Sequence, residues 1–336
     1  MIVEVNHLTK KYGEHTAVSD LSFTIEKGKV YGFLGPNGAG KSTTMNIMTG
    51  CLAATEGEIK IGGFDIYENP VEAKKLIGYL PEIPPLYQDR TPREYLTFVA
   101  GAKGISKGNI KEAIENVMEE TKISDVADRL IRNLSKGYKQ RVGIAEAIIG
   151  DPELIILDEP TVGLDPKQII EIRSLIKKLG EKHTVILSSH ILSEVQAVCD
   201  TIMIISKGKL LACDSPENLE SLFEGKHKVD LEVIGDEKKL REALGDVGGI
   251  DKITIAEKED SIVSASLEAK GKTDKTEICK AIFYACSKNN LPIIQMNNMK
   301  ASLEEIFIEL TTKEESEDLA EPQIEAAPKG KSEVNE

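Results

Sequence analysis

The chain has few cysteines, no long apolar run and a deficit of basic residues, and each shortage excludes a class of protein. Its five cysteines form no CxxC pair and have no histidine nearby at metal-ligand spacing, which disfavours a zinc site and a disulfide framework and favours a reducing cytosol. A membrane-spanning run of about 18 apolar residues is absent, and so is a basic, apolar leader at the N-terminus. We therefore expect a soluble protein that needs a separate partner for any membrane role.

The charge balance also restricts the partners. A formal net charge of −14 argues against a nucleic acid held through its phosphates, which requires clustered Lys and Arg. A length of 336 residues is enough for two domains, because single domains cluster at roughly 100 to 200 residues.

A glycine-rich loop stands between a predicted buried strand, residues 30–34, and a predicted helix, residues 42–49. It reads Gly35-Pro36-Asn37-Gly38-Ala39-Gly40-Lys41-Ser42. Its glycines let successive backbone N–H groups point inward and form an anion site at the positive end of the helix. Lys41 can then reach the β and γ phosphates of a nucleotide, and the Ser42 hydroxyl can supply one Mg²⁺ ligand. A turn without a ligand is the alternative, and the complete motif in this setting disfavours it.

Acidic residues follow two further predicted strands. Residues 154–157 form a continuous apolar run that delivers Asp158 and Glu159 at its carboxyl end. In a P-loop enzyme the first carboxylate completes the Mg²⁺ shell, and the second can polarise the attacking water. Glu82 follows the strand at residues 77–80, where it either meets a ligand or is a solvated loop acid.

Two more residues are candidates for the same sheet edge or its surroundings. His190 follows the predicted strand at residues 184–188, which would place it beside Asp158 and Glu159, although a lone histidine at a strand end is usually structural. Tyr12 lies at the first turn and could stack on an adenine ring, with simple packing as an equal alternative.

The segment between the strands at 77–80 and 154–157 is helical in pattern. Thr91-Pro92-Arg93-Glu94 is a capping box that begins a helix at residues 95–102, and residues 109–121 form a second amphipathic helix. Ser135 and Gly137 then precede a helix at residues 142–149, where hydroxyl, backbone N–H groups and dipole favour an anion. A plain N-cap would look similar.

Residues 1 to about 222 resemble the ATP-binding cassette of an ABC transporter, with P-loop, antiparallel β and helical subdomains (the last at about residues 84–150). The resemblance implies that Tyr12 stacks on adenine, that the glycine-rich loop with Thr43 binds ATP, and that Ser42, Asp158 and Glu82 face Mg²⁺. It also implies that Glu159 is the catalytic carboxylate and His190 the switch histidine. The signature, which acts on the other subunit's ATP, is represented by Ser135, Gly137 and Gln140, and the dimer D-loop by Asp165.

Two positions depart from the family pattern. The usual LSGGQ signature is Leu-Ser-Lys-Gly-Tyr here, and the Q-loop carries Glu82 where the family has Gln. Ser135 and the second glycine, Gly137, are retained, so we expect the signature to function. The change at Glu82 leaves its contacts with metal and water open.

The remainder of the chain has a different pattern. Residues 226–311 alternate as strand, helix, strand, strand, helix, strand, which is the α+β ferredoxin-like order. A last helix follows, with an apolar stripe at Leu303, Ile306, Phe307 and Leu310, and residues 223–227 are a plausible linker. The segment resembles the C-terminal end of cassettes from drug, antibiotic and membrane-component exporters. Residues 312–336 are acidic, with Pro and Ala, and read as a disordered tail.

The function predicted from the sequence is an ATPase subunit that drives transport, with export favoured, through a separate membrane permease. One chain carries one P-loop and one signature, so two chains must face each other, most simply as a homodimer, with ATP between them. We expect it in the cytoplasm, on the inner face of the membrane through the permease, with ATP and Mg²⁺ as cofactors and no nucleic-acid partner. The rivals are an ABC ATPase that acts on ribosomes or DNA and a regulatory module without turnover; the single cassette and the pair Glu159 and His190 disfavour them.

Overall fold

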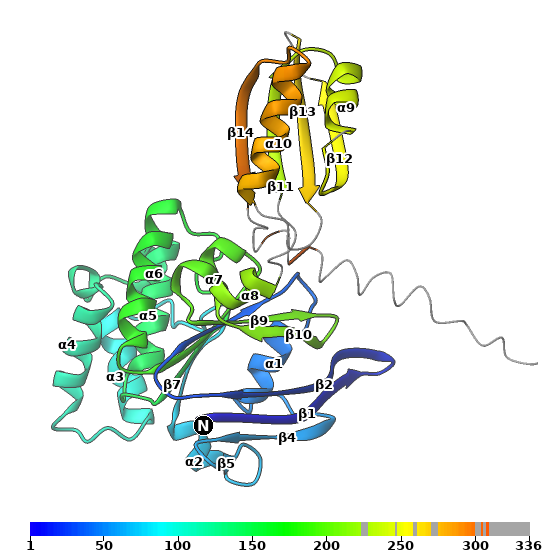
Figure 1. Cartoon of the computed structure of the whole chain (residues 1–336). Helices are drawn as coiled ribbons and strands as arrows, with labels where there is room; N and C mark the ends of the chain where they lie inside the picture. Colours follow the sequence, from blue (N-terminus) through cyan, green and yellow to red (C-terminus); the bar gives the residue numbers. More distant parts are fainter. Residues whose placement is uncertain are drawn as a thin grey trace, which may run out of the picture.

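The computed structural model describes residues 1–222, 228–245, 247–257, 261–269 and 275–299, together with 304, 307 and 308. Its strands form three sheets, two within the first 214 residues and one in the C-terminal part. Figure 1 shows the two N-terminal sheets with their helices below and the C-terminal sheet above them. No helix among these residues is long and apolar enough to cross a membrane.

The first sheet is antiparallel and has the order β2-β1-β4-β5. The alternation of apolar and polar residues produces it, because one face of β1 and β2 is buried while the other meets solvent. The antiparallel β subdomain that the resemblance implies is confirmed, and its short strand β5 was not predicted. The bounds are β1 Val3–Tyr12, β2 His15–Ile25, β4 Glu56–Ile61 and β5 Phe64–Asp65.

The second sheet, with the order β10-β9-β3-β8-β7-β6, is parallel except for β10. Strands β3, β7 and β8 are buried along their whole length, as continuous apolar runs predict. Their carboxyl ends meet at one edge, and this edge carries the glycine-rich loop, Asp158 and His190. The bounds are β3 Val30–Leu34, β6 Ile77–Leu80, β7 Leu154–Leu157, β8 Thr184–Ser189, β9 Thr201–Ser206 and β10 Lys209–Asp214.

The helix after the glycine-rich loop, α1 (Lys41–Met48), lies between the two sheets (Figure 1). Met45, Ile47 and Met48 are fully buried in the apolar cluster that joins the sheets. The orientation of the helix is restricted, because it packs on apolar residues of both sheets. Its first turn is therefore fixed against the sheet edge.

A group of helices covers the other face of the parallel sheet, with the exception of α2 (Pro70–Lys75), whose Ala73 is buried in the cluster that joins the two sheets. The capping box at Thr91 is confirmed, since its side chain accepts from the Glu94 N–H and the Glu94 carboxylate accepts from the Thr91 N–H. The bounds are α2 Pro70–Lys75, α3 Pro92–Ala102, α4 Ile110–Glu120, α5 Lys136–Ile148, α6 Pro166–Gly180, α7 Leu192–Val198 and α8 Pro216–Leu222, with short 3-10 turns at Ser124–Val126 and Ile131–Asn133.

Two of these helices differ from the prediction. Helix α5 begins at Lys136, six residues before the expected start at 142, because Ser135 caps it and the polar residues that follow continue its first turns. Helix α7 was not predicted. It is only seven residues long and begins directly after the loop of His190, too short for its apolar period to stand out.

The third sheet is antiparallel, with the order β12-β13-β11-β14, and its two helices pack on one face. The predicted succession of elements in this part of the chain is confirmed. Its core is a separate apolar cluster to which α9 and α10 contribute Leu240 and Ile282. The bounds are β11 Lys228–Ile234, α9 Glu237–Gly245, β12 Ile250–Glu257, β13 Ile262–Ala269, α10 Lys275–Lys288 and β14 Ile293–Met299.

The predicted last helix is only partly within the described residues. Phe307 is half-buried and packs against the apolar cluster of the parallel sheet and its helices, which includes Leu219. Leu303, Ile306 and Leu310 of the expected stripe lie outside the described residues, as do the linker at 223–227 and the tail at 312–336. Phe307 thus contacts the N-terminal part of the chain.

Candidate functional site

The glycine-rich loop is shaped by close approaches that exclude larger side chains. A Cβ added at Gly35 would lie 2.3 Å from the Ile205 carbonyl oxygen, and one at Gly40 would lie 2.5 Å from that of Ala17. Gly40 also has a φ of +100°, in the left-handed region that favours glycine, and it caps α1. The loop therefore curls tightly into the N-terminus of α1, where exposed N–H groups and the helix dipole favour an anion.

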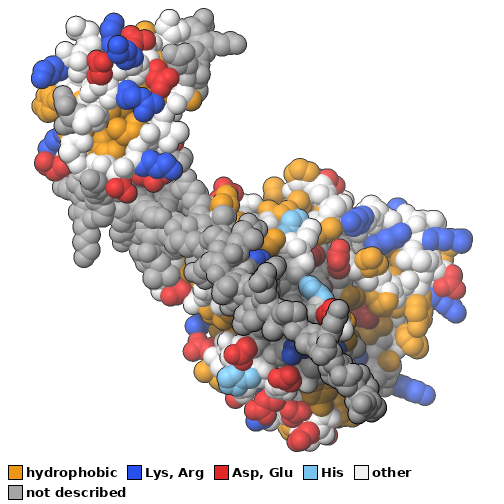
Figure 2. Space-filling view, turned by 90° about the vertical axis from the view of Figure 1, so that its right-hand side faces the viewer, with side chains coloured by type: hydrophobic (Ala, Val, Ile, Leu, Met, Phe, Trp, Pro, Cys, Tyr) orange, Lys and Arg blue, Asp and Glu red, His pale blue; other side chains and the backbone are white. Residues whose placement is uncertain are grey.

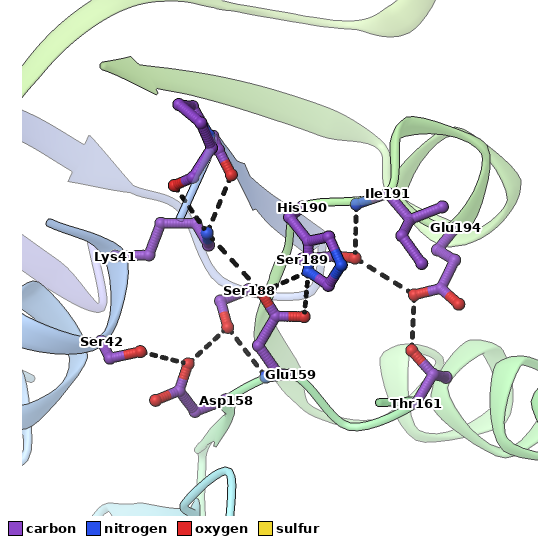
Figure 3. A network of polar contacts seen from close by, with 12 residues as sticks. Lys41, Ser42, Asp158, Glu159, Thr161, Ser188, Ser189, His190, Ile191 and Glu194 are labelled. Carbon is purple, nitrogen blue, oxygen red and sulfur yellow. Dashed lines mark hydrogen bonds and ion pairs between the residues drawn. The ribbon is translucent and has the colours of Figure 1, made fainter. Parts of the chain in front are cut away.

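Lys41 is buried at the base of this loop. Its Nζ donates to the Gly35 carbonyl at 2.8 Å and to the Pro36 carbonyl at 3.2 Å, and it lies 3.6 Å from the Glu159 carboxylate. The side chain thus folds back along the loop, and its positive charge lies between the loop and the end of β7 (Figure 3).

Two hydroxyl side chains, from α1 and β8, meet at Asp158, which directly follows β7. The Ser42 hydroxyl donates to Asp158 Oδ1 at 3.1 Å, and the Ser188 hydroxyl donates to the same oxygen at 2.5 Å. Ser188 Oγ also accepts from the Glu159 N–H at 2.8 Å. Figure 3 shows this chain of contacts, which ties the ends of β7 and β8 to the first turn of α1.

Glu159 and His190 are in direct contact. His190 Nδ1 lies 3.0 Å and 3.1 Å from the two carboxylate oxygens of Glu159. Glu159 is only 7% exposed and has a φ of +48°, an uncommon backbone conformation for a residue other than glycine. Such strain persists only where the surroundings enforce it, and it is concentrated at functional sites.

A second line of polar contacts supports Ser42 from behind. The Tyr79 hydroxyl donates to Asn46 Oδ1 at 3.2 Å, and Asn46 Nδ2 donates to the Ser42 carbonyl at 2.8 Å. Burial and, next, the charge of Asp158 raise the pKa of Tyr79. The hydroxyl therefore stays protonated and remains a donor.

Lys41, Ser42, Glu159 and His190 line one pocket of about 470 Å³, whereas Asp158 is not among its lining residues. The structure brings together most of the residues predicted from the sequence, although the residues of the pocket come from five separate segments. Its walls are Tyr12, His15, Ala17, Asn37, Gly38, Gly40, Lys41, Ser42, Thr43, Glu82, Glu159, Val162 and His190. His15, Ala17 and Val162 were not predicted as site residues. The sequence could have indicated them only because they lie within five positions of Tyr12 or Glu159 in the chain.

Tyr12 stands at the edge of the pocket and is 49% exposed. The Lys10 ammonium lies over its ring, 5.1 Å from the centroid. A tyrosine that only filled the apolar core would be largely buried. A flat aromatic face is thus available beside the glycine-rich loop.

The predicted signature residues are not among the residues that line this pocket. Ser135 caps α5 and accepts from the Tyr138 N–H, and Asp165 caps α6 and accepts from the Gln168 N–H. A Cβ added at Gly137 would meet the Gln168 side chain at 2.5 Å, so the first turns of α5 and α6 lie together. Gln140 is buried, and its Nε2 has no hydrogen-bond partner within the described structure.

Comparisons with known proteins identify the family. A family profile described as ABC transporter matches residues 18–162. The chain is 32% identical to the linearmycin resistance ATP-binding protein LnrL of Bacillus subtilis over 312 residues, 92% of this chain and 98% of that protein. The chain belongs to the ATP-binding subunits of ABC transporters.

Two further matches concern the ABC cassette itself. This ABC subunit is 43% identical to the bacitracin transport ATP-binding protein BcrA of Bacillus licheniformis over 212 residues, 62% of this chain and 68% of that one. It is also similar to the solved dimer of an ATP-binding cassette bound to ADP and Pi in a post-hydrolysis state, with a TM-score of 0.58 and 26% identity over 63% of this chain and 98% of that chain. The chain is an ABC ATPase that hydrolyses ATP.

Proposed function

We propose that this ABC ATPase drives the export of an antibiotic through a separate membrane permease, with ATP held between two facing copies. The direction and the substrate class rest on the similarity to proteins of linearmycin resistance and bacitracin transport. The observation that carries the site assignment is the single pocket in which the glycine-rich loop, Glu159 and His190 meet.

The residues of the pocket suit a triphosphate. The backbone N–H groups of residues 37–43 and the Lys41 ammonium receive the phosphates, and the exposed ring of Tyr12 receives the adenine. Glu159 accepts a proton from the attacking water. His190 contacts both oxygens of the Glu159 carboxylate and orients that carboxylate. Both groups lie on the same sheet edge as the phosphate loop, so no large movement is needed to reach the γ-phosphate.

The donor set beside the pocket fits Mg²⁺. Ser42 and Asp158 present two oxygens that are 3.1 Å apart, and Glu82 lines the same pocket. Among the described residues no three His, Cys, Asp or Glu side chains are grouped so as to hold a metal alone. This suits an ion that binds one or two protein oxygens together with substrate phosphates, which is the usual mode for Mg²⁺. When bound, the ion would neutralise phosphate charge.

The position of the signature supports a composite site. None of Ser135, Gly137, Gln140 and Asp165 lines the chain's own pocket, yet Ser135 and Gly137 form a helix N-terminus suited to an anion. A facing second copy would bring this N-terminus to the phosphates held by Lys41. The solved dimer of a similar cassette supports this arrangement.

An apolar surface beside the pocket suits the permease. Ile83, next to Glu82, is 82% exposed, and the Tyr87 ring lies 5.6 Å from the exposed ring of Phe98. Exposed aromatic and aliphatic groups of this kind are typical of protein contacts. A permease docked here would place the chain at the cytoplasmic face of the membrane. Because Ile83 directly follows Glu82, a movement of Glu82 would shift a residue in contact with the permease. On the face drawn in Figure 2, described Lys and Arg side chains are interspersed with acidic ones, which does not favour a nucleic-acid partner.

The division into domains is part of the proposal. Residues 1–222 form the cassette, with its helical subdomain at about 84–150, and residues 226–311 form an accessory domain, followed by a tail at 312–336. The strand order β12-β13-β11-β14 and the two helices on one face support a ferredoxin-like fold for the accessory domain.

The test of the proposed function is Glu159→Gln, which keeps the shape of the side chain and removes its charge. ATP binding should persist, turnover should fall by about 100-fold or more, and the protein should accumulate as an ATP-bound dimer. Phosphate release and sedimentation with ATP measure both effects. Turnover near the wild-type rate would remove Glu159 from the role of base, and an ATP-bound monomer would contradict the composite site.

A further inference from the structure

A buried carboxylate outside the pocket connects the two loops that carry Glu159 and His190. Glu194, in the first turn of α7, is 5% exposed. Its Oε2 accepts from the Thr161 hydroxyl at 2.5 Å and from the Ser189 hydroxyl at 3.1 Å. Figure 3 shows Glu194 on the far side of His190, between Thr161 and Ser189.

Each hydroxyl belongs to a tight turn around one of the two site residues. Thr161 lies in the turn that the Val162 N–H closes on the Glu159 carbonyl at 3.2 Å. Ser189 Oγ accepts from the Ile191 N–H at 3.0 Å and so closes the turn around His190. A shift of either hydroxyl would therefore move a residue that is at most two positions away in the chain.

The carboxylate is partly compensated. The Arg173 guanidinium, from α6, lies 3.9 Å from Glu194 Oε1. Arg173 Nε is buried and has no hydrogen-bond partner in the described part of the chain. A buried carboxylate costs free energy unless it is hydrogen-bonded and paired, and apolar packing at this place would be simpler. Retention of a charge here calls for a role that an apolar residue could not fill.

We propose that Glu194 is a positioning residue for ATP hydrolysis, which clamps Thr161 and Ser189 and thereby fixes Glu159 against His190. The inference rests on the roles proposed above for those two residues. Ser188 joins the same two strand ends on the near side of the site, through Asp158 and the Glu159 N–H. With one tie on each side of the Glu159–His190 contact, the backbone of neither loop can shift without straining a buried hydrogen bond.

The test removes one hydroxyl at a time from the clamp. Thr161→Val and Ser189→Ala should each lower kcat for ATP hydrolysis by about 10-fold to 100-fold, because small misplacement of reacting groups is costly. KM for ATP should change by less than about twofold, since neither residue lines the pocket. Thr161→Ser, which retains a hydroxyl, should recover most of the lost rate.

Thr121→Val is the matched control. Thr121 is also buried, and its hydroxyl donates to the Val117 carbonyl at 2.7 Å, but it lies at the end of α4 and contacts neither loop. The melting temperature of Thr121→Val should fall by about as much as that of Thr161→Val, while its kcat stays at the wild-type value. Equal kcat for Thr121→Val and Thr161→Val, or a loss in KM without a loss in kcat, would overturn the proposal.

Two further outcomes separate this inference from the function on which it rests. If Glu159→Gln abolishes turnover while Thr161→Val and Ser189→Ala both retain the wild-type kcat, the clamp is wrong and the assigned base stands. If Glu159→Gln retains turnover, the assigned base is wrong, and the clamp is refuted with it. Should Thr161→Val fail to fold, Ser189→Ala decides alone, because it only deletes an oxygen.

Discussion

At the scale of single residues, the site is a balance of charges in a confined space. Lys41 is the buried cation, and Asp158 and Glu159 are the buried carboxylates around it. Glu82 adds a third carboxylate, exposed to solvent, to the walls of the pocket. An acid there accepts hydrogen bonds and faces a metal well, but it cannot donate and it repels a triphosphate unless a cation lies between them.

The charge of Glu82 should therefore be visible in the dependence on Mg²⁺. Glu82→Gln should hydrolyse ATP at a rate within about threefold of the wild type but need a different Mg²⁺ concentration for half-maximal rate, whereas Glu82→Ala should lower the rate by about 10-fold. Titration of ATPase activity with Mg²⁺ at fixed ATP checks this. Glu72→Gln, on the exposed surface of α2, is the control. An identical Mg²⁺ response in all four proteins would place Glu82 outside the site.

At the scale of elements, the N-termini of α5 and α6 lie side by side, and neither lines the chain's own pocket. Gly137 approaches only the end of the flexible Gln168 side chain, and Lys136 Nζ lies over Gly163. Packing within one chain therefore tolerates a methyl group at position 137. If glycine is needed there, the reason is the close approach of something outside the chain.

Gly137→Ala separates these two possibilities. The melting temperature of the isolated chain should remain at the wild-type value or rise slightly, since alanine favours a helix by about 1 kcal/mol over glycine. Dimer formation with ATP, measured by sedimentation in the Glu159→Gln background, should weaken by about 10-fold or more. Gly101→Ala, in α3 with no atom near the added methyl, is the matched control and should leave dimerisation unchanged. Unchanged dimerisation in Gly137→Ala would mean that no ligand meets this helix end.

At the scale of the whole molecule, the C-terminal part of the chain returns to the cassette. The third sheet has its own core, in which Leu231 and Leu240 are fully buried, so it packs without help from the other two. Phe307 then packs on the cluster that includes Leu219. Of the apolar stripe predicted for the last helix, Phe307 therefore contacts the first part of the chain and not the core of the third sheet.

This contact should make the cassette more stable in the full-length chain than alone. Phe307→Ala should lower the free energy of unfolding of the cassette by about 1 to 3 kcal/mol, because a half-buried ring is lost. A chain ending at Leu222 should show the same loss and still bind ATP, since every residue of the pocket is retained. Phe283→Ala on α10, whose ring is 53% exposed, is the control and should change stability little. Urea unfolding of the four proteins decides the matter, and equal stability of all four would show that the contact carries no energy.

The sequence by itself determined the elements and most of the pocket. Strand-end residues such as Asp158 and His190 could be assigned to one edge, because parallel strands delivered by right-handed connections end together. The glycine-rich loop was recognisable because its glycines meet requirements of the backbone itself, as the φ of Gly40 and the close approach at Gly35 show. Ser135 was placed at a helix N-terminus, but the length of α5 was underestimated, because only its apolar part at residues 142–149 has a clear helical period.

Only the tertiary structure decided which polar groups outside the motifs matter. Glu194 lies in a helix too short to predict, and its partners Thr161 and Ser189 are 33 and five positions away, so nothing local marks them as a unit. The same holds for Phe307, because the third sheet lies between it and the cluster with Leu219 in the chain. A local sequence pattern reflects the constraints that neighbours in the chain place on a residue. A buried hydrogen bond or a shared core depends on how separate elements pack against each other, and no short stretch of sequence contains that information.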